Sequence, residues 1–169
     1  VKYLRFEQIA YRVLYALRKR FVNKVYTKDI NNSVESIQWS NTIQKATSYL
    51  GGSEFCFLNI TQKFNDKVDW NYDEYGKLWT YNLNYFDFLN QVSINQSEAL
   101  ILIKDYVSRT DELKDGLEPY PTSLRGINWI KYLSKENIQD EKISKSLYNQ
   151  YLRLLDNLEY HLLGNHLLE

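Results

Sequence analysis

Both histidines of the chain, His161 and His166, lie within its last twelve residues, where they could take part in proton transfer. Between them, Gly164 interrupts an apolar helical pattern, and Asn165 follows where a new helix would begin. The free N–H groups and the positive end of the dipole make such a helix start favourable for an anion. Asn165 therefore has two interpretations at this point, as the ordinary N-cap of a helical corner or as an amide that binds an anionic group.

A second set of chemically useful side chains recurs at helical spacing after Pro121. At 100° per residue, one helix face collects Arg125, Asn128, Trp129 and Tyr132. A guanidinium that pairs with a carboxylate, an amide that bonds hydroxyl groups and a ring that stacks on a sugar would suit a uronic acid. The alternative is an amphipathic helix whose polar face meets water, although a fully exposed tryptophan is unusual.

The stretch from Trp79 to Asp87 mixes aromatic rings with two asparagines. Its polar groups could line a groove where a sheet meets a helix, but an aromatic core with a few capping amides is the plainer interpretation. Elsewhere the chain has no Ser/His/Asp set, P-loop, dinucleotide fingerprint or cluster with metal-ligand spacing.

Composition limits the classes of protein to consider. The 169 residues are 44% hydrophobic and 25% charged, as in a globular domain. Twenty-one basic residues balance 21 acidic ones, so no overall field favours nucleic acid. The single cysteine, Cys56, excludes an internal disulfide framework. No apolar run of about 18 residues and no secretory signal is visible. The chain opens with Val1 and ends at Leu167-Leu168-Glu169, where an amphipathic helix has only just restarted. We therefore expect a fragment of a longer protein.

The first 25 residues predict a basic amphipathic helix. Such a helix can lie on an anionic membrane or bind a polyanion. Its apolar stripe is continuous enough to pack on a domain, and this interpretation is favoured over membrane contact by residues 1–24. We accordingly expect Leu14, Leu17 and Phe21 to be mostly buried.

The rest of the chain predicts a mainly α fold with a small antiparallel β element near residues 55–81. Residues 27–53 are polar and suggest loop, with one short helix near 42–50. Strands are expected at 55–60, 68–70 and 77–81. Helices are expected at 83–90, at 99–107 with Ser97 as cap, from Thr122 or Ser123 to 133, and at 138–163. Short loops between successive helices predict antiparallel hairpins. We divide the chain into residues 1–53 and a main domain at 54–169.

Four segments carry a family resemblance. They read Asp69-Trp70, Lys77-Leu78-Trp79-Thr80-Tyr81-Asn82-Leu83-Asn84-Tyr85-Phe86, Glu118-Pro119-Tyr120-Pro121-Thr122-Ser123-Leu124-Arg125-Gly126-Ile127-Asn128-Trp129 and Gly164-Asn165-His166-Leu167-Leu168-Glu169. In this order they resemble the N-terminal domain of heparinase II/III-like polysaccharide lyases. The resemblance implies an incomplete (α/α) toroid, which a β-sandwich domain would follow in the parent protein.

The same resemblance implies β-elimination at a uronic acid, without a cofactor or metal. An amide at the position of Asn165 would neutralise the substrate carboxylate, with His166 beside it as the second catalytic candidate. The expected substrate-binding residues are Arg125, Asn128, Trp129, Tyr132, Asn84, Tyr85 and Tyr120. The family's catalytic tyrosine would lie after Glu169, so residues 1–169 alone should be inactive.

The expected partner is an acidic polysaccharide, and the family suggests a bacterial cell-envelope or periplasmic role. An alternative function is a non-catalytic glycan-binding or capsule- or envelope-associated domain with the same fold.

Overall fold

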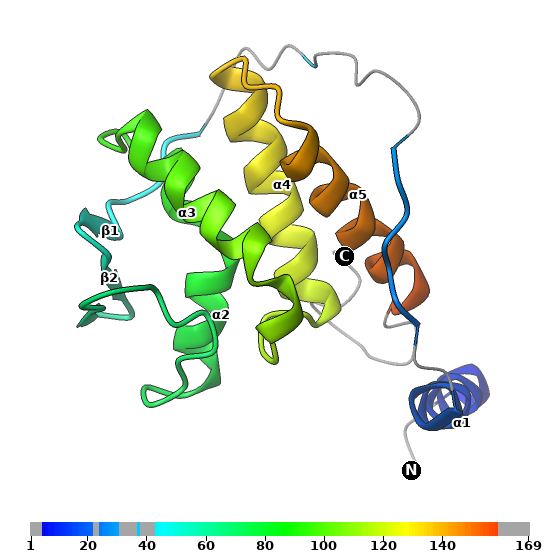
Figure 1. The fold of residues 1–169 in the computed structure, drawn as a ribbon. Coiled ribbons are helices and arrows are strands. Elements are labelled where there is room, and N and C mark those ends of the chain that lie inside the picture. The colour runs from blue at the N-terminus through cyan, green and yellow to red at the C-terminus, as the bar shows by residue number, and fades with distance from the viewer. Residues whose placement is uncertain (1–4, 22–23, 31–36, 38–42, 159–169) are drawn as a thin grey trace.

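The computed structural model describes residues 5–21, 24–30, 37 and 43–158, and the structural findings refer to these residues (Figure 1). Helices and a small sheet follow in the order α1 (Phe6–Phe21), β1 (Tyr49–Gly51), β2 (Glu54–Phe57), β3 (Ile60–Lys63), α2 (Lys77–Tyr85), η1 (Asp87–Asn90), α3 (Gln96–Ser108), η2 (Thr110–Glu112), α4 (Pro119–Lys135) and α5 (Glu141–Asp156). The fold is therefore mainly helical with a three-stranded antiparallel sheet, which confirms the expected class.

The sheet lies earlier in the chain than expected. Its strands have the order β1-β2-β3, and β2 and β3 pair in an antiparallel hairpin in which Phe55 lies opposite Gln62. The prediction of a strand at 77–81 is wrong, because these residues belong to α2. Within α2 the fully buried Trp79 and Leu83 are four residues apart, which is helical spacing. The sheet accordingly spans residues 49–63, and residues 68–70 form no strand.

Several predicted helix boundaries also need correction. Asn95, rather than Ser97, caps α3, since its Oδ1 accepts a hydrogen bond of 2.9 Å from the Ser97 N–H. Helix α4 begins at Pro119, not at Thr122 or Ser123, because proline is well suited to the first helical position. No helix forms at 43–50, and α5 ends at Asp156. The remainder of the predicted last helix, from residue 159, lies outside the described residues.

The four larger helices after the sheet pack in alternation. Helix α2 packs on α4, α4 packs on α5, and α3 packs on α5. Figure 1 shows α3, α4 and α5 running side by side, with the sheet on the side of α2 and α3. Helices that are second neighbours in the chain are thus direct neighbours in space.

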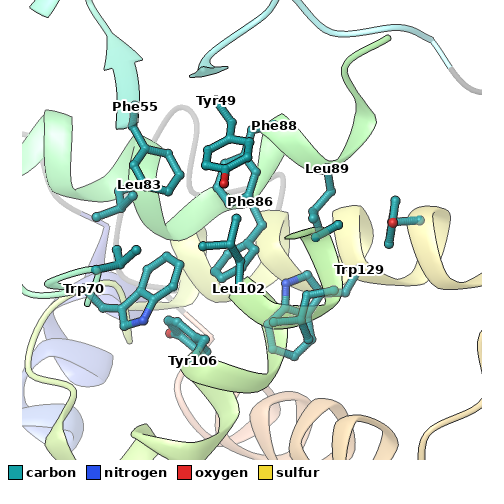
Figure 2. Close-up of a cluster of buried hydrophobic side chains, with 14 of the residues drawn as sticks. Tyr49, Phe55, Trp70, Leu83, Phe86, Phe88, Leu89, Leu102, Tyr106 and Trp129 are labelled. Carbon is teal, nitrogen blue, oxygen red and sulfur yellow. The ribbon is translucent and has the colours of Figure 1, made fainter. Parts of the chain in front are cut away.

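An aromatic cluster fills the space between the sheet and these helices (Figure 2). The ring of Phe86 stacks on Trp70 at 5.0 Å between centroids and meets the edge of Trp129 at 5.3 Å. Phe86 ends α2 in the left-handed conformation, with φ 57°. This conformation is uncommon for a bulky residue, and the complete burial of the Phe86 side chain offsets its strain.

The side chain of Gln91 ties the sheet to the helices. Its Oε1 accepts hydrogen bonds of 3.0 Å from the backbone N–H groups of Ser48 and Tyr49. Its Nε2 donates to the carbonyl oxygen of Tyr49 at 2.8 Å. One buried amide thus satisfies both main-chain groups of Tyr49 in β1.

Helix α1 lies apart from the main body and meets it near the C-terminal end of α5 (Figure 1). The Tyr15 hydroxyl donates to the carbonyl oxygen of Leu158, and the Arg18 guanidinium pairs with the Asp156 carboxylate at 2.8 Å. The predicted burial of Leu14 and Leu17 is wrong, because they are 54% and 52% exposed. The side chain of Phe21 lies outside the described part of the structure.

The segment at residues 24–30 then runs alongside α5 (Figure 1). The Asn149 amide holds it at two points, since its Oδ1 accepts from the Lys28 N–H at 2.8 Å and its Nδ2 donates to the Lys28 carbonyl at 3.0 Å. Among the described residues, no helix is both long enough and apolar enough to cross a bilayer.

Candidate functional site

The two motif segments in α2 and α4 meet around the guanidinium of Arg125. Its Nε donates to Gln150 Oε1 at 2.6 Å, and its Nη1 donates to the carbonyl oxygens of Asn84 and Gly116 at 3.2 and 2.9 Å. Its Nη2 donates to Thr122 Oγ1 at 3.3 Å. Arg125 thereby links the C-terminal end of α2, the loop before α4, and α5.

The Arg125 side chain is completely enclosed, and all the acceptors in these hydrogen bonds are neutral. Burial lowers the pKa of the guanidinium, and the Tyr106 ring, 4.8 Å from its central carbon, partly compensates through a cation–π contact. A substrate carboxylate could reach Arg125 only by displacing these partners. The enclosure therefore favours a positioning role over direct substrate contact.

Asn128 and Asn84 have similar interior positions. The Asn128 Nδ2 donates to the Tyr85 carbonyl at 2.9 Å and to Asp87 Oδ1 at 2.6 Å. The Asn84 Nδ2 donates to the carbonyl oxygens of Trp70 and Thr80, both at 2.9 Å. Both asparagines are buried, so their amides hold the backbone around the end of α2.

Trp129 and Tyr132 complete the predicted polar face of α4, and both belong to the hydrophobic core. Trp129 is fully buried, and burial raises the pKa of Tyr132 to about 12. The face from Arg125 to Tyr132 is thus a continuous feature, as its spacing indicated, but it points into the protein. Helical spacing cannot distinguish a buried polar face from one that lines a cleft.

One partly accessible part of the motif region is a group of three tyrosines, Tyr81, Tyr85 and Tyr120, here called the tyrosine cluster. The rings of Tyr81 and Tyr85, one turn apart on α2, lie 6.3 Å apart. Tyr120, in the first turn of α4, meets Tyr85 edge-on at 5.8 Å. Tyr81 and Tyr120 are partly exposed, whereas Tyr85 is 9% exposed and its ring packs against both of theirs.

An ion pair borders the tyrosine cluster. Lys77 Nζ lies 2.6 Å from Glu118 Oε1 and 5.2 Å from the centroid of the Tyr81 ring. Burial opposes ionisation of Glu118, but its contacts with Lys77 and Tyr81 outweigh this effect, and its pKa lies below the usual range. The hydrogen bond to Glu118 in turn raises the pKa of Lys77. The cluster therefore carries one fixed positive and one fixed negative charge at neutral pH.

Tyr81 and Tyr85 remain protonated under ordinary conditions. Burial, followed by the nearby Glu118 carboxylate, raises the pKa of Tyr81 to about 12. Burial, followed by the neighbouring tyrosines, raises the pKa of Tyr85 to about 12. Neutral phenols can donate hydrogen bonds and stack on apolar ring faces, but they are poor general bases at pH 7.

An open hollow of about 1270 Å³ lies between α3, α5 and the segment at residues 24–27, and Thr122, Arg125 and Gln150 are among the residues around it, although the Arg125 side chain itself is completely buried. Three of its lysines are paired with carboxylates, as Lys24–Asp156, Lys104–Asp140 and Lys145–Asp29. Because these pairs neutralise most of its charge, the hollow has no strong preference for an anion.

The expected catalytic residues Asn165 and His166 lie outside the described residues. Their catalytic roles therefore stay predictions. Across residues 5–21, 24–30, 37 and 43–158, no group of three histidine, cysteine or carboxylate side chains is arranged to hold a metal ion.

Three neighbours of the predicted residues were not singled out from the sequence, namely Lys77, Tyr81 and Glu118. The spacing of Lys77, Tyr81 and Tyr85 at four-residue intervals could have indicated them. That signal requires residues 77–85 to form one helix, whereas the sequence suggested a strand at 77–81 and a helix only from residue 83.

Comparison of the chain with protein-family models, with curated proteins and with solved structures finds no match.

Proposed function

We propose that this chain is the N-terminal, substrate-cleft portion of a polysaccharide lyase that cleaves a uronic-acid-containing acidic polysaccharide by β-elimination. One observation carries this proposal. The motif segments at residues 77–86 and 118–129 are joined by hydrogen bonds between α2 and α4, from Arg125 to the Asn84 carbonyl and from Asn128 to the Tyr85 carbonyl. The tyrosine cluster is a partly accessible face of these two helices. Aromatic rings with protonated hydroxyl groups provide both a stacking surface and hydrogen-bond donors for a sugar.

The alternating contacts of the helices support the proposed toroid. In an (α/α) toroid, successive hairpins place one helix in an inner layer and the next in an outer layer. Contacts of α2 with α4 and of α3 with α5 are those expected for two such layers. We propose that the chain forms the first part of an incomplete (α/α) toroid, which further hairpins of the parent protein extend.

The proposed reaction breaks the C5–H and C4–O bonds of the uronic acid and forms a C4–C5 double bond. The amide of Asn165 would neutralise the substrate carboxylate and so stabilise the charge that develops as the C5 proton leaves. His166 is the neighbouring candidate for proton transfer, and the leaving oxygen takes up a proton. The proposal requires no metal or cofactor.

The remaining residues divide into two proposed roles. Tyr120, supported by Tyr85, contacts the sugar at the tyrosine cluster. Arg125, Asn128 and Asn84 are positioning residues, because each is buried and holds the backbone on which the cluster stands. Trp129 and Tyr132 belong to the core that supports these positioning residues.

The alternative is a non-catalytic glycan-binding domain, including one associated with a capsule or cell envelope. One observation favours it, since the tyrosines of the cluster with shifted pKa values are poor bases at neutral pH. Such a domain would bind a polysaccharide and release no product. The two functions therefore differ in whether an unsaturated product is formed.

The test uses the parent protein that contains this chain and a panel of uronic-acid polymers, with ultraviolet absorbance of the unsaturated uronate as readout. We expect product formation, and Asn165→Ala should lower turnover by about 10²–10³ with little change in KM. If Asn165 is only a cap, the substitution should cost about 1 kcal/mol of stability and leave turnover unchanged.

Residues 1–169 alone should bind a polymer without converting it, since the family resemblance implies a catalytic tyrosine that this chain does not contain. Binding without product by the parent protein would favour the alternative function. A parent protein that neither binds nor converts any acidic polysaccharide contradicts both functions.

A further inference from the structure

Helix α1 exposes a continuous apolar face, although it contacts the main body. Phe6, Val13, Leu14 and Leu17 are 84%, 55%, 54% and 52% exposed. At 100° per residue, these four side chains fall within an arc of about 100° on one side of the helix. Single exposed apolar residues are ordinary, but four on one face of one helix form a surface that a partner could cover.

The contacts that hold α1 come from another side of the helix. The Tyr15 hydroxyl binds the carbonyl oxygen of Leu158, and Arg18 pairs with Asp156. On the same projection Tyr15 lies about 180° and Arg18 about 120° from Phe6. An ordinary surface helix turns its apolar face to the core and its polar face to water. Helix α1 has the opposite orientation, with polar side chains toward the body and the apolar face outward.

The charge of α1 indicates the chemistry of the missing partner. Its sequence contains four basic residues and one acidic residue, Glu7. Arg5 and Arg12 are exposed and lie about 100° and 120° from Phe6, on the flank that begins at the half-buried Ile9, whereas the exposed Glu7 lies about 100° from Phe6 on the opposite flank. An apolar face bordered by basic side chains is the pattern of helices that lie in the interface of an anionic membrane, where each charge adds to the affinity.

We propose that α1 docks on an anionic membrane surface, with Phe6, Val13, Leu14 and Leu17 inserted among the lipids and Arg5 and Arg12 at the headgroups. This inference rests on exposure, orientation and charge, and it is independent of the proposed lyase function. The contacts with Asp156 and Leu158 then hold the main body on the aqueous side of the helix.

A second copy of the chain is a poorer fit to this surface. A helix of 16 residues is about 24 Å long and offers a face of roughly 240 Å², whereas a stable interface buries about 800 Å² on each partner. Two copies meeting through this face would also bring together two helices that each contain four basic residues and one acidic residue. A membrane needs no matching shape and supplies the negative charge.

The experiment is co-sedimentation of the chain of 169 residues with vesicles of phosphatidylcholine alone or of phosphatidylcholine with phosphatidylglycerol. We expect at least about tenfold tighter binding to the anionic vesicles, because the exposed Arg5 and Arg12 add positive charge to the docked helix. Raising the salt concentration to about 1 M shortens the Debye length to about 3 Å and should remove most of this preference.

Leu17→Asp tests insertion, and Arg12→Glu tests attraction by the headgroups. Each should weaken binding to anionic vesicles by at least about tenfold. The matched control is Ile101→Asp, since Ile101 is 65% exposed on α3, outside the proposed membrane face. Its binding should equal that of the unchanged chain, and thermal melts should show that all three variants fold.

Equal affinity for neutral and anionic vesicles would overturn the proposal, as would an Ile101→Asp variant that binds as weakly as Leu17→Asp. A chain that forms dimers without vesicles, and loses them on Leu17→Asp while never sedimenting with lipid, would identify a second copy as the partner instead.

Discussion

The guanidinium of Arg125 donates to the main-chain carbonyl oxygen of Asn84, 41 residues earlier in the chain, at 3.2 Å. The same nitrogen also binds the carbonyl oxygen of Gly116. Three separate segments, at the end of α2, before α4 and within α4, therefore depend on one buried cation. The geometry of the tyrosine cluster follows from this arrangement, since Tyr85 and Tyr120 belong to two of these segments.

Replacing Arg125 should destabilise the protein strongly. Arg125→Met retains much of the volume but leaves the acceptors of Asn84, Gly116 and Gln150 without donors, which should cost about 3 kcal/mol or more. In a chain of this size the melting temperature should fall by roughly 6–12 °C. Arg153→Met is the matched control, because the Arg153 guanidinium makes no ion pair among the described residues. A melting temperature for Arg125→Met equal to that of the control would refute this role.

Gly116 should tolerate no side chain. It has φ 71°, and an added Cβ would lie 2.3 Å from the side-chain carbon of Asn84. Gly116→Ala should therefore combine backbone strain with overpacking, at a total cost of about 2–4 kcal/mol. Gly52→Ala provides the comparison, because Gly52 also has a positive φ, of 57°, with open space around its Cβ position. Chemical denaturation of both variants should show the larger loss for Gly116→Ala; equal losses would mean that Asn84 moves aside.

The attachment of α1 should weaken in acid. The hydrogen bond from Lys24, together with those from Arg18 and Tyr26, lowers the pKa of Asp156 to about 2. Because this pKa is depressed, the contribution of Asp156 is present above its unfolded value of about 3.9 and is lost as the pH falls toward 2. An NMR titration of the Asp156 carboxyl carbon should therefore give a midpoint near 2.

Lys24→Gln should raise that midpoint toward the unfolded value. Lys142→Gln removes an equal charge elsewhere on the protein, because Lys142 lies in the first turn of α5 and Asp156 at its end. The control should leave the midpoint unchanged. An unchanged midpoint in Lys24→Gln as well would show that Lys24 does not control this carboxylate.

The tyrosine cluster should determine the affinity for an acidic oligosaccharide. Tyr120→Ala removes an accessible ring while Tyr85 remains supported by Tyr81, and it should raise Kd by roughly two- to tenfold. Calorimetric titration of the chain with a uronic-acid oligosaccharide measures this change. Tyr148→Ala serves as control, since Tyr148 is a 42% exposed tyrosine on α5 outside the cluster. Equal effects of the two substitutions would remove the cluster from the proposed site.

The sequence allowed the helical class and most helix positions to be predicted, because periodic apolar residues mark the buried side of a helix. The first part of α2, residues 77–81, was mistaken for a strand, because aromatic residues in a short run also suit a sheet. The mistake could be avoided only by weighing the four-residue spacing of Trp79 and Leu83 above their individual preferences. Asn95 and Ser97 are both good caps, and only the observed bond to Asn95 distinguishes them.

The environment of Arg125 could not be predicted from its own helix. Its burial depends on carbonyl groups that come from Asn84 and Gly116, and local spacing contains no information about these contacts. Helix α1 shows the same limit. Its apolar stripe was apparent, but the side facing the body depends on Asp156 and Leu158, more than 130 residues later.

The amide of Gln91 has a consequence for self-association. A strand at the edge of a sheet presents unpaired main-chain groups that can recruit a strand from another molecule. At Tyr49 both groups are already bound by Gln91, so β1 offers no template at this position. A single side chain thus protects the edge of the sheet at Tyr49 from strand addition, and replacing Gln91 by alanine would expose these two main-chain groups without altering the sequence of any strand.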